Sequence, residues 1–94
     1  MSQQDYCLIA FANSHTAICA RRALEEAGLT AYMMPTPREI CASCGLSLRF
    51  PPEEYPQARQ AVRDKSLPEE CYSFYRMTYD EYHRQVVPME ELVH

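Results

Sequence analysis

The sequence has no hydrophobic run long enough to cross a bilayer, because its longest apolar stretch, residues 6–12, falls far short of the roughly 20 residues that a spanning helix needs. It also lacks a basic stripe: the nine basic residues are scattered and the net charge is −4, which gives little support to nucleic-acid binding. The polar N-terminus has no basic segment followed by an apolar one, so no secretory signal is predicted. We therefore expect a cytoplasmic protein that binds neither membranes nor nucleic acids.

The chain is short, and its 94 residues predict a single domain with a small core. A hydrophobic content of 47%, with seven Tyr and three Phe, is sufficient for that core to pack. The five cysteines are an odd number, and without an export signal we expect free thiols in a reducing compartment. The sequence does not indicate an oligomeric state.

Hydrophobic patterning predicts the element order strand, helix, strand, strand, helix, strand. The continuous apolar run at residues 6–12 is typical of a central strand that is covered on both faces. Residues 14–27 predict a helix that Gly28 ends, and a second helix is predicted over residues 53–65. The other three predicted strands cover residues 29–34, 46–50 and 71–77.

This order predicts an α+β fold, the ferredoxin-like split βαβ sandwich (βαββαβ), in which a four-stranded antiparallel sheet carries both helices on one face. Its first and third strands would be central. A small parallel α/β sheet is the competing arrangement, but the connection of about eleven residues between the second and third strands is short for a crossover with its own helix. Residues 1–78 would form this domain, and residues 79–94 a short helix and tail.

The segment of residues 35–50 concentrates the residues with chemical potential. Cys41 and Cys44 form a Cys-x-x-Cys that Gly45 follows, in a segment rich in turn-forming residues. A thiol reacts as its thiolate, which nearby positive charge and backbone N–H donors stabilise. Arg38 and Arg49 flank Cys44 and could supply that charge, while Gly45 leaves the sulfur accessible. The sequence therefore predicts a reactive thiol at Cys44 beside an anion site formed by Arg38, Gly45 and Arg49.

The role of Cys41 stays open at this point. A Cys-x-x-Cys can act as a redox dithiol, and it can also supply half of a zinc site. No second Cys-x-x-Cys or His-x-x-His completes such a site in this sequence, so no metal and no cofactor is predicted. The remaining cysteines, Cys7, Cys19 and Cys71, lie in strand and helix patterns and are interpreted as small buried hydrophobes.

One group of positions carries a family resemblance: Phe11-x-x-Ser14, Ala17, Leu24 and Gly28, then Pro35-x-Pro37-Arg38-x-Ile40-x-x-x-Cys44-Gly45-x-x-Leu48-Arg49-Phe50. This pattern, over residues 6–77, resembles a family of small bacterial proteins described as selenium/sulfur carrier-like, found alone or joined to sulfur-relay domains. The resemblance implies that Cys44 is the carrier residue and that Pro35, Pro37, Arg38 and Arg49 belong to the same motif. Cys41 does not belong to the family pattern.

The leading hypothesis is a carrier of sulfur or selenium, of sulfurtransferase type, that holds a persulfide or selenosulfide on Cys44. Its partners would be donor and acceptor proteins of a sulfur relay. Two alternatives remain open: a non-catalytic interaction or regulatory module, and a metal or redox sensor that uses Cys41 and Cys44. The sequence does not decide between sulfur and selenium, nor does it name the donor or acceptor.

Overall fold

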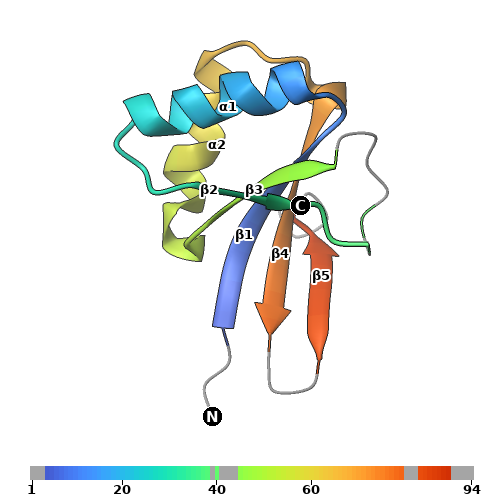
Figure 1. The fold of residues 1–94 in the computed structure, drawn as a ribbon. Helices are drawn as coiled ribbons and strands as arrows, with labels where there is room; N and C mark the ends of the chain where they lie inside the picture. Colours follow the sequence, from blue (N-terminus) through green and yellow to red (C-terminus); the bar gives the residue numbers. More distant parts are fainter. Residues whose placement is uncertain (1–3, 39, 41–44, 80–82, 90–94) are drawn as a thin grey trace.

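The computed structural model describes residues 4–38, 40, 45–79 and 83–89 of the chain. These residues form one antiparallel sheet with two α-helices against it (Figure 1). In chain order the elements are β1 (Gln4–Phe11), α1 (Ser14–Glu26), β2 (Tyr32–Pro35), β3 (Leu46–Phe50), a 3-10 turn η1 (Pro52–Glu54), α2 (Tyr55–Asp64), a 3-10 turn η2 (Glu69–Cys71), β4 (Tyr72–Tyr79) and β5 (Arg84–Pro88). The strand order across the sheet is β2-β3-β1-β4-β5.

Strand β1 lies in the middle of the sheet and is buried on both faces. It pairs with β3 on one side, where Ile9 lies opposite Leu48, and with β4 on the other, where Ile9 lies opposite Phe74. Each residue from Cys7 to Phe11 is buried. A strand without an exposed face needs an apolar side chain at every position, which explains the continuous apolar run in the sequence.

Both helices cover one face of the sheet, and the main core lies between them and the strands (Figure 1). The alternate residues Cys7, Ile9 and Phe11 of β1 point into this core, because successive side chains of a strand face opposite sides. The other buried members are Ala17, Ala20, Leu24, Leu48, Phe50, Ala58, Val62, Phe74 and Met89. Small residues on α1 let this helix pack close to the sheet.

Helix α1 begins and ends where local chemistry predicts. The side chain of Asn13 accepts a hydrogen bond from the backbone N–H of Thr16 at 2.8 Å, which caps the first turn. Gly28 has φ +77°, the left-handed conformation that ends many helices and that favours glycine. Ala17, Ala20 and Leu24, spaced three and four residues apart, are buried on the side of the helix that faces the sheet.

The opposite face of the sheet is not open to solvent everywhere. A second cluster packs there around Leu8, Ala10 and Met77, and Ile40 from the loop between β2 and β3 joins it with only 7% of its surface exposed. The partly buried residues around this cluster are Tyr6, Met34, Tyr75, Tyr79 and Val86. The β2–β3 loop therefore contributes a side chain to the core on the face that the helices leave uncovered.

The predicted four-stranded sheet is wrong in strand number, although the α+β class, the antiparallel pairing and the two helices are confirmed. Residues 84–88 form a fifth strand, β5, in place of the predicted tail, and it pairs with β4 from Tyr75 to Tyr79. Tyr79 belongs to β4 and Arg84 to β5, while residues 80–82, on which the predicted short helix mainly falls, lie outside the described residues, so this helix stays a prediction. The physical reason is that the long strand β4 offers a free edge, which the following segment satisfies by hydrogen bonding. The predicted division at residue 78 stays a prediction.

Both outer strands, β2 and β5, end in a proline. In the β2–β3 pair the backbone N–H of Thr36 donates to the carbonyl of Gly45 at 2.9 Å. Hydrogen-bonded and non-hydrogen-bonded pairs alternate along an antiparallel ladder, so Pro35, one residue earlier, directs its nitrogen away from β3. The nitrogen of Pro35, which carries no hydrogen, thus points to the free edge of the sheet.

No helix among the described residues is long and apolar enough to cross a membrane.

Replacing Leu24 by alanine should lower the free energy of unfolding by about 2–5 kcal/mol, because the fully buried side chain leaves a cavity behind. The matched control on the same helix is Ile18→Ala, whose side chain is 50% exposed and whose loss should cost less than about 1 kcal/mol. Urea denaturation of both variants measures the difference. Equal losses would contradict the placement of the core between α1 and the sheet.

Candidate functional site

The loop between β2 and β3 is closed by hydrogen bonds at its base. Thr36 donates its backbone N–H to the carbonyl of Gly45, and its hydroxyl lies 2.7 Å from the hydroxyl of Ser47. Ser47 is fully buried, so the hydroxyl pair satisfies two polar groups that would otherwise lose their hydrogen bonds to water. The ends of the loop are therefore fixed to the sheet.

The first half of the loop is also held by packing. The backbone N–H of Ile40 donates to the carbonyl of Pro37 at 3.0 Å and closes a tight turn. Pro37 is buried, and Ile40 packs on the second core cluster with Leu8 and Ala10. The stiff Pro35-Thr36-Pro37 segment thus leads the chain from the sheet edge onto the sheet face.

Cys41 and Cys44 lie outside the described residues, so their predicted roles remain predictions. Gly45, which follows Cys44 directly, is exposed, and a Cβ atom built at this position meets no atom within 4 Å. Steric crowding within the described part of the chain therefore does not explain the glycine. The predicted reason, access to the preceding sulfur, stays a prediction.

Arg49 lies on the sheet face opposite the helices, and two tyrosine rings hold it there. Its guanidinium carbon is 4.7 Å from the ring centre of Tyr6 on β1 and 5.4 Å from that of Tyr32 on β2. Such cation–π contacts are worth about 0.5–2 kcal/mol each, depending on exposure. Among the described residues no carboxylate forms an ion pair with Arg49. Its N–H groups are therefore suited to an external anion.

Arg38, the other predicted anion ligand, is exposed on the loop. The two arginines thus differ in how they are held, since Arg49 is half-buried between aromatic rings and Arg38 is not enclosed. Whether both guanidinium groups face Cys44 stays a prediction, because Cys44 is outside the described residues.

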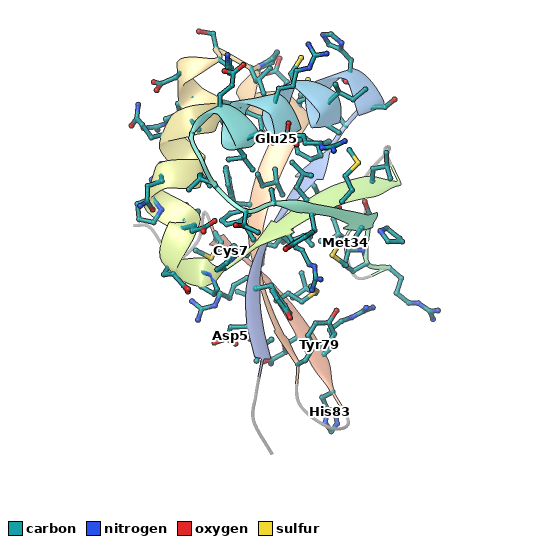
Figure 2. The ribbon with its side chains drawn as sticks, turned by 60° about the vertical axis from the view of Figure 1, so that its left-hand side comes forward. Asp5, Cys7, Glu25, Met34, Tyr79 and His83 are labelled. Atoms are coloured by element: carbon teal, nitrogen blue, oxygen red, sulfur yellow. The ribbon has the colours of Figure 1, made fainter. Side chains whose placement is uncertain are left out.

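Cys7 is sealed inside the main core, as predicted. Figure 2 shows it on β1 beneath the helical layer, and its exposed fraction is zero. Burial raises the pKa of its thiol from the ordinary 9.0 to about 11, while the positive charge of Arg76 acts weakly in the opposite direction. Arg76 itself donates to Asp5 at 3.0 Å, and this hydrogen bond holds the pKa of the Asp5 carboxyl below its ordinary value. Cys7 is thus protonated at neutral pH.

The other two described cysteines are less buried than predicted. Cys71 and Cys19 are both half-buried, and the sulfur of Cys19 lies 3.7 Å from Nε2 of His15. The i, i+4 spacing of His15 and Cys19 in a predicted helix already placed them side by side, a signal that the sequence prediction overlooked. Among the described residues no group of three or more His, Cys, Asp or Glu side chains could hold a metal ion.

The i, i+4 spacings on the outer face of α1 predict two ion pairs, Arg21–Glu25 and Arg22–Glu26, and the structure forms the first of them, at 3.3 Å. Glu26 instead pairs with Lys65 at the end of α2, at 2.7 Å, because the two helices lie against each other there. The hydrogen bond from Lys65 lowers the pKa of Glu26.

The raised pKa of Cys7 predicts a loss of stability at alkaline pH. The thiol loses its proton near pH 9.0 in the unfolded chain but only near pH 11 in the folded protein. The contribution of Cys7 to the free energy of unfolding is therefore complete below pH 9.0 and decreases as the pH rises from 9.0 to about 11. The shift corresponds to a decrease of about 2–3 kcal/mol. Denaturation under reducing conditions across this range should show a shallower decline for Cys7→Ala than for the wild type. The control Cys19→Ala should show the same decrease in stability as the wild type. If the curves of stability against pH are parallel for all three proteins, the decrease does not come from Cys7.

Comparison with known proteins gives one family. Residues 6–73 match the model of the family described as "Putative Se/S carrier protein-like". A search of curated proteins and a search of solved structures give no match. The matched region runs from β1 to the start of β4 and includes the whole loop with Cys44 and Gly45. It covers well over half of the sequence, and the chain belongs to the putative Se/S carrier protein-like family.

Proposed function

We propose that the protein is a carrier of sulfur or selenium that holds the transferred atom on Cys44. The family match carries this proposal, because it spans the loop with the Cys44-Gly45 pair and the family is named for this function. The structure of the other cysteines supports it. Cys7, the most deeply buried of the described thiols, is protonated at neutral pH and closed to any donor.

The proposed chemistry is thiol exchange. The thiolate of Cys44 attacks the outer sulfur of a donor persulfide, the donor S–S bond breaks, and the donor leaves as a thiolate. Cys44 then carries the sulfur as a persulfide, and the thiolate of an acceptor takes it by the same type of step. A selenium atom would be carried as a selenosulfide. No net oxidation or reduction occurs, so no cofactor is required.

Arg49 and Arg38 have the proposed role of binding the anionic sulfur. The support for Arg49 is its position: a guanidinium without a carboxylate partner among the described residues, fixed between Tyr6 and Tyr32 on the face that carries the loop. A pre-oriented guanidinium loses little conformational entropy when it binds an anion. Arg38, on the loop itself, would complete the site on the solvent side.

The proposed partners are donor and acceptor proteins of a cytoplasmic sulfur relay. Arg38 and Gly45 on either side of the cysteines are exposed, which suits transfer between proteins, and the base of the loop is fixed by the Thr36–Gly45 and Thr36–Ser47 contacts. A fixed base reduces the conformational entropy that the ends of the loop would lose when a partner binds.

The proposed fold assignment is the ferredoxin-like split βαβ sandwich, extended by one strand. Two observations support it: β4, β1, β3 and β2 are consecutive in the sheet, with β1 and β3 inside, and both helices pack on one face. On this assignment β5 is an addition to the edge at β4.

Cys44→Ser should abolish the uptake of sulfur from a persulfide donor, because a hydroxyl is neither ionised nor polarisable enough to replace the thiolate. Cys41→Ser should keep most of the uptake, since a carrier needs one nucleophilic sulfur. Intact-mass spectrometry after incubation with the donor measures the added sulfur atoms. The matched control is Cys71→Ser, a half-buried cysteine outside the loop.

Other outcomes separate the alternatives. Equal loss in Cys41→Ser and Cys44→Ser would favour a redox or metal site that uses both thiols. A wild-type protein that gains no sulfur, with or without a partner protein, would favour an interaction module.

Arg49→Gln should slow the alkylation of Cys44 at neutral pH by about fivefold, equivalent to ~1 kcal/mol for the loss of a nearby positive charge. The difference should shrink as the pH rises above the thiol pKa, where the anion forms without help. Arg38→Gln should act in the same direction. The control is Arg63→Gln, an exposed arginine in the last turn of α2. If Arg49→Gln and Arg38→Gln both leave the alkylation rate unchanged, the two arginines do not belong to the site.

A further inference from the structure

The outer surface of α1 carries a second arrangement of reactive groups, remote in sequence from the loop. His15, Cys19 and Arg22 follow one another at spacings of four and three residues, which place them on one side of the helix. His15 and Arg22 are exposed, and Cys19 is half-buried. Helix α1 belongs to the layer on the other side of the sheet from Arg49 and Ile40 (Figure 1). The two surfaces are therefore separated by the sheet.

The contact between Cys19 and His15 has the geometry of a thiol with its base. The Cys19 sulfur lies 3.7 Å from Nε2 of the imidazole, within hydrogen-bonding distance for sulfur. Both side chains project from consecutive turns of a helix whose first turn Asn13 caps, so the backbone holds them in register. A neutral imidazole nitrogen in this position can accept the thiol proton, as in other activated cysteines.

The comparison with the other described cysteines singles out Cys19. Cys7 has no exposed surface, and burial raises its pKa to about 11. Cys71 is half-buried like Cys19, but within the described part of the chain it has no imidazole contact. Exposure and an imidazole contact thus occur together at Cys19, whereas Cys71 has no described imidazole contact and Cys7 has neither feature.

We propose that His15 and Cys19 form a second thiol site, which undergoes exchange with small anionic disulfides. The imidazole of His15 takes the proton from Cys19, and the thiolate attacks one sulfur of the disulfide. A new bond forms between Cys19 and that sulfur, the original S–S bond breaks, and the other half leaves as a thiolate that regains the proton from His15. The disulfide is the oxidant, and its departing half is the reduced product.

Arg22 gives the site its preference for a carboxylate-bearing disulfide. It lies one turn beyond Cys19, and no described carboxylate forms an ion pair with it. The charge of Arg22 acts on the nearby Glu26 and helps to lower its pKa, but the Glu26 carboxylate makes its hydrogen bond to Lys65, at 2.7 Å. The guanidinium of Arg22 is therefore available to a carboxylate of the incoming molecule, and such charge-assisted hydrogen bonds are short and strong. Ile18, 50% exposed and one turn before Arg22, offers an apolar contact for the same molecule.

The test uses the full chain with Cys41→Ser and Cys44→Ser, so that the result does not depend on the carrier proposal. The protein is incubated with oxidised glutathione, and peptide mapping by mass spectrometry follows the adduct at each remaining cysteine. Cys19 should react first, ahead of Cys71. His15→Gln should slow the reaction at Cys19 by roughly a hundredfold, the lower end of what a positioned base contributes. His83→Gln, a change at another exposed histidine, should leave the rate unchanged.

A second variant tests the class of ligand. Arg22→Gln should slow the reaction with oxidised glutathione several-fold and leave the rate with cystamine, a cationic disulfide, unchanged or higher. The proposal is overturned if Cys19 reacts no faster than Cys71, or if His15→Gln reacts at the wild-type rate. An equal effect of Arg22→Gln on both disulfides would overturn the preference for anions.

Discussion

The burial of β1 on both faces is the constraint on which the rest of this structure depends. A central strand with apolar side chains on each side must be covered twice, and the two α-helices of the described residues both lie on the same face. The second cover comes from Ile40 and from the aromatic residues around Leu8 and Met77. The loop that carries the candidate cysteines therefore also completes the core, and its position is stabilised by the hydrophobic effect as well as by the hydrogen bonds at its base.

This double role links the chemistry of the loop to the stability of the fold. A loop without packing would have to be ordered each time a partner binds, at a cost in conformational entropy. Here the burial of Pro37 and Ile40 and the contact between Thr36 and Ser47 order the described ends of the loop during folding. The sheet then separates two surfaces of different character: arginine between tyrosines beside the loop, and a cysteine with its histidine on α1.

Local patterns in the sequence predict α1 and β3 well, whereas the strand predicted over residues 29–34 is found at Tyr32–Pro35. The alternation in residues 46–50 predicts β3 with its bounds, and Asn13 and Gly28 predict both ends of α1. Features that depend on distant pairing were not predictable in this way. Strand β5 has little alternation of its own and exists because β4 offers an edge. The stacking of Arg49 on Tyr6 and Tyr32 joins three strands and follows only from their register, which the sequence pattern does not supply.

The proline at the end of an outer strand affects how readily the edges of two sheets can pair with each other. The rim of a sheet offers unpaired amide groups to any passing chain, and uncontrolled pairing there leads to fibrous aggregates. The backbone nitrogen of Pro35 points to the free edge of the sheet and carries no hydrogen. A foreign strand that aligned beside β2 would therefore lack one hydrogen bond at that residue. With β2 only four residues long, one missing donor is a substantial fraction of the ladder. The stiff segment that directs the loop thus also makes the edge of the sheet at β2 a poorer template for a foreign strand.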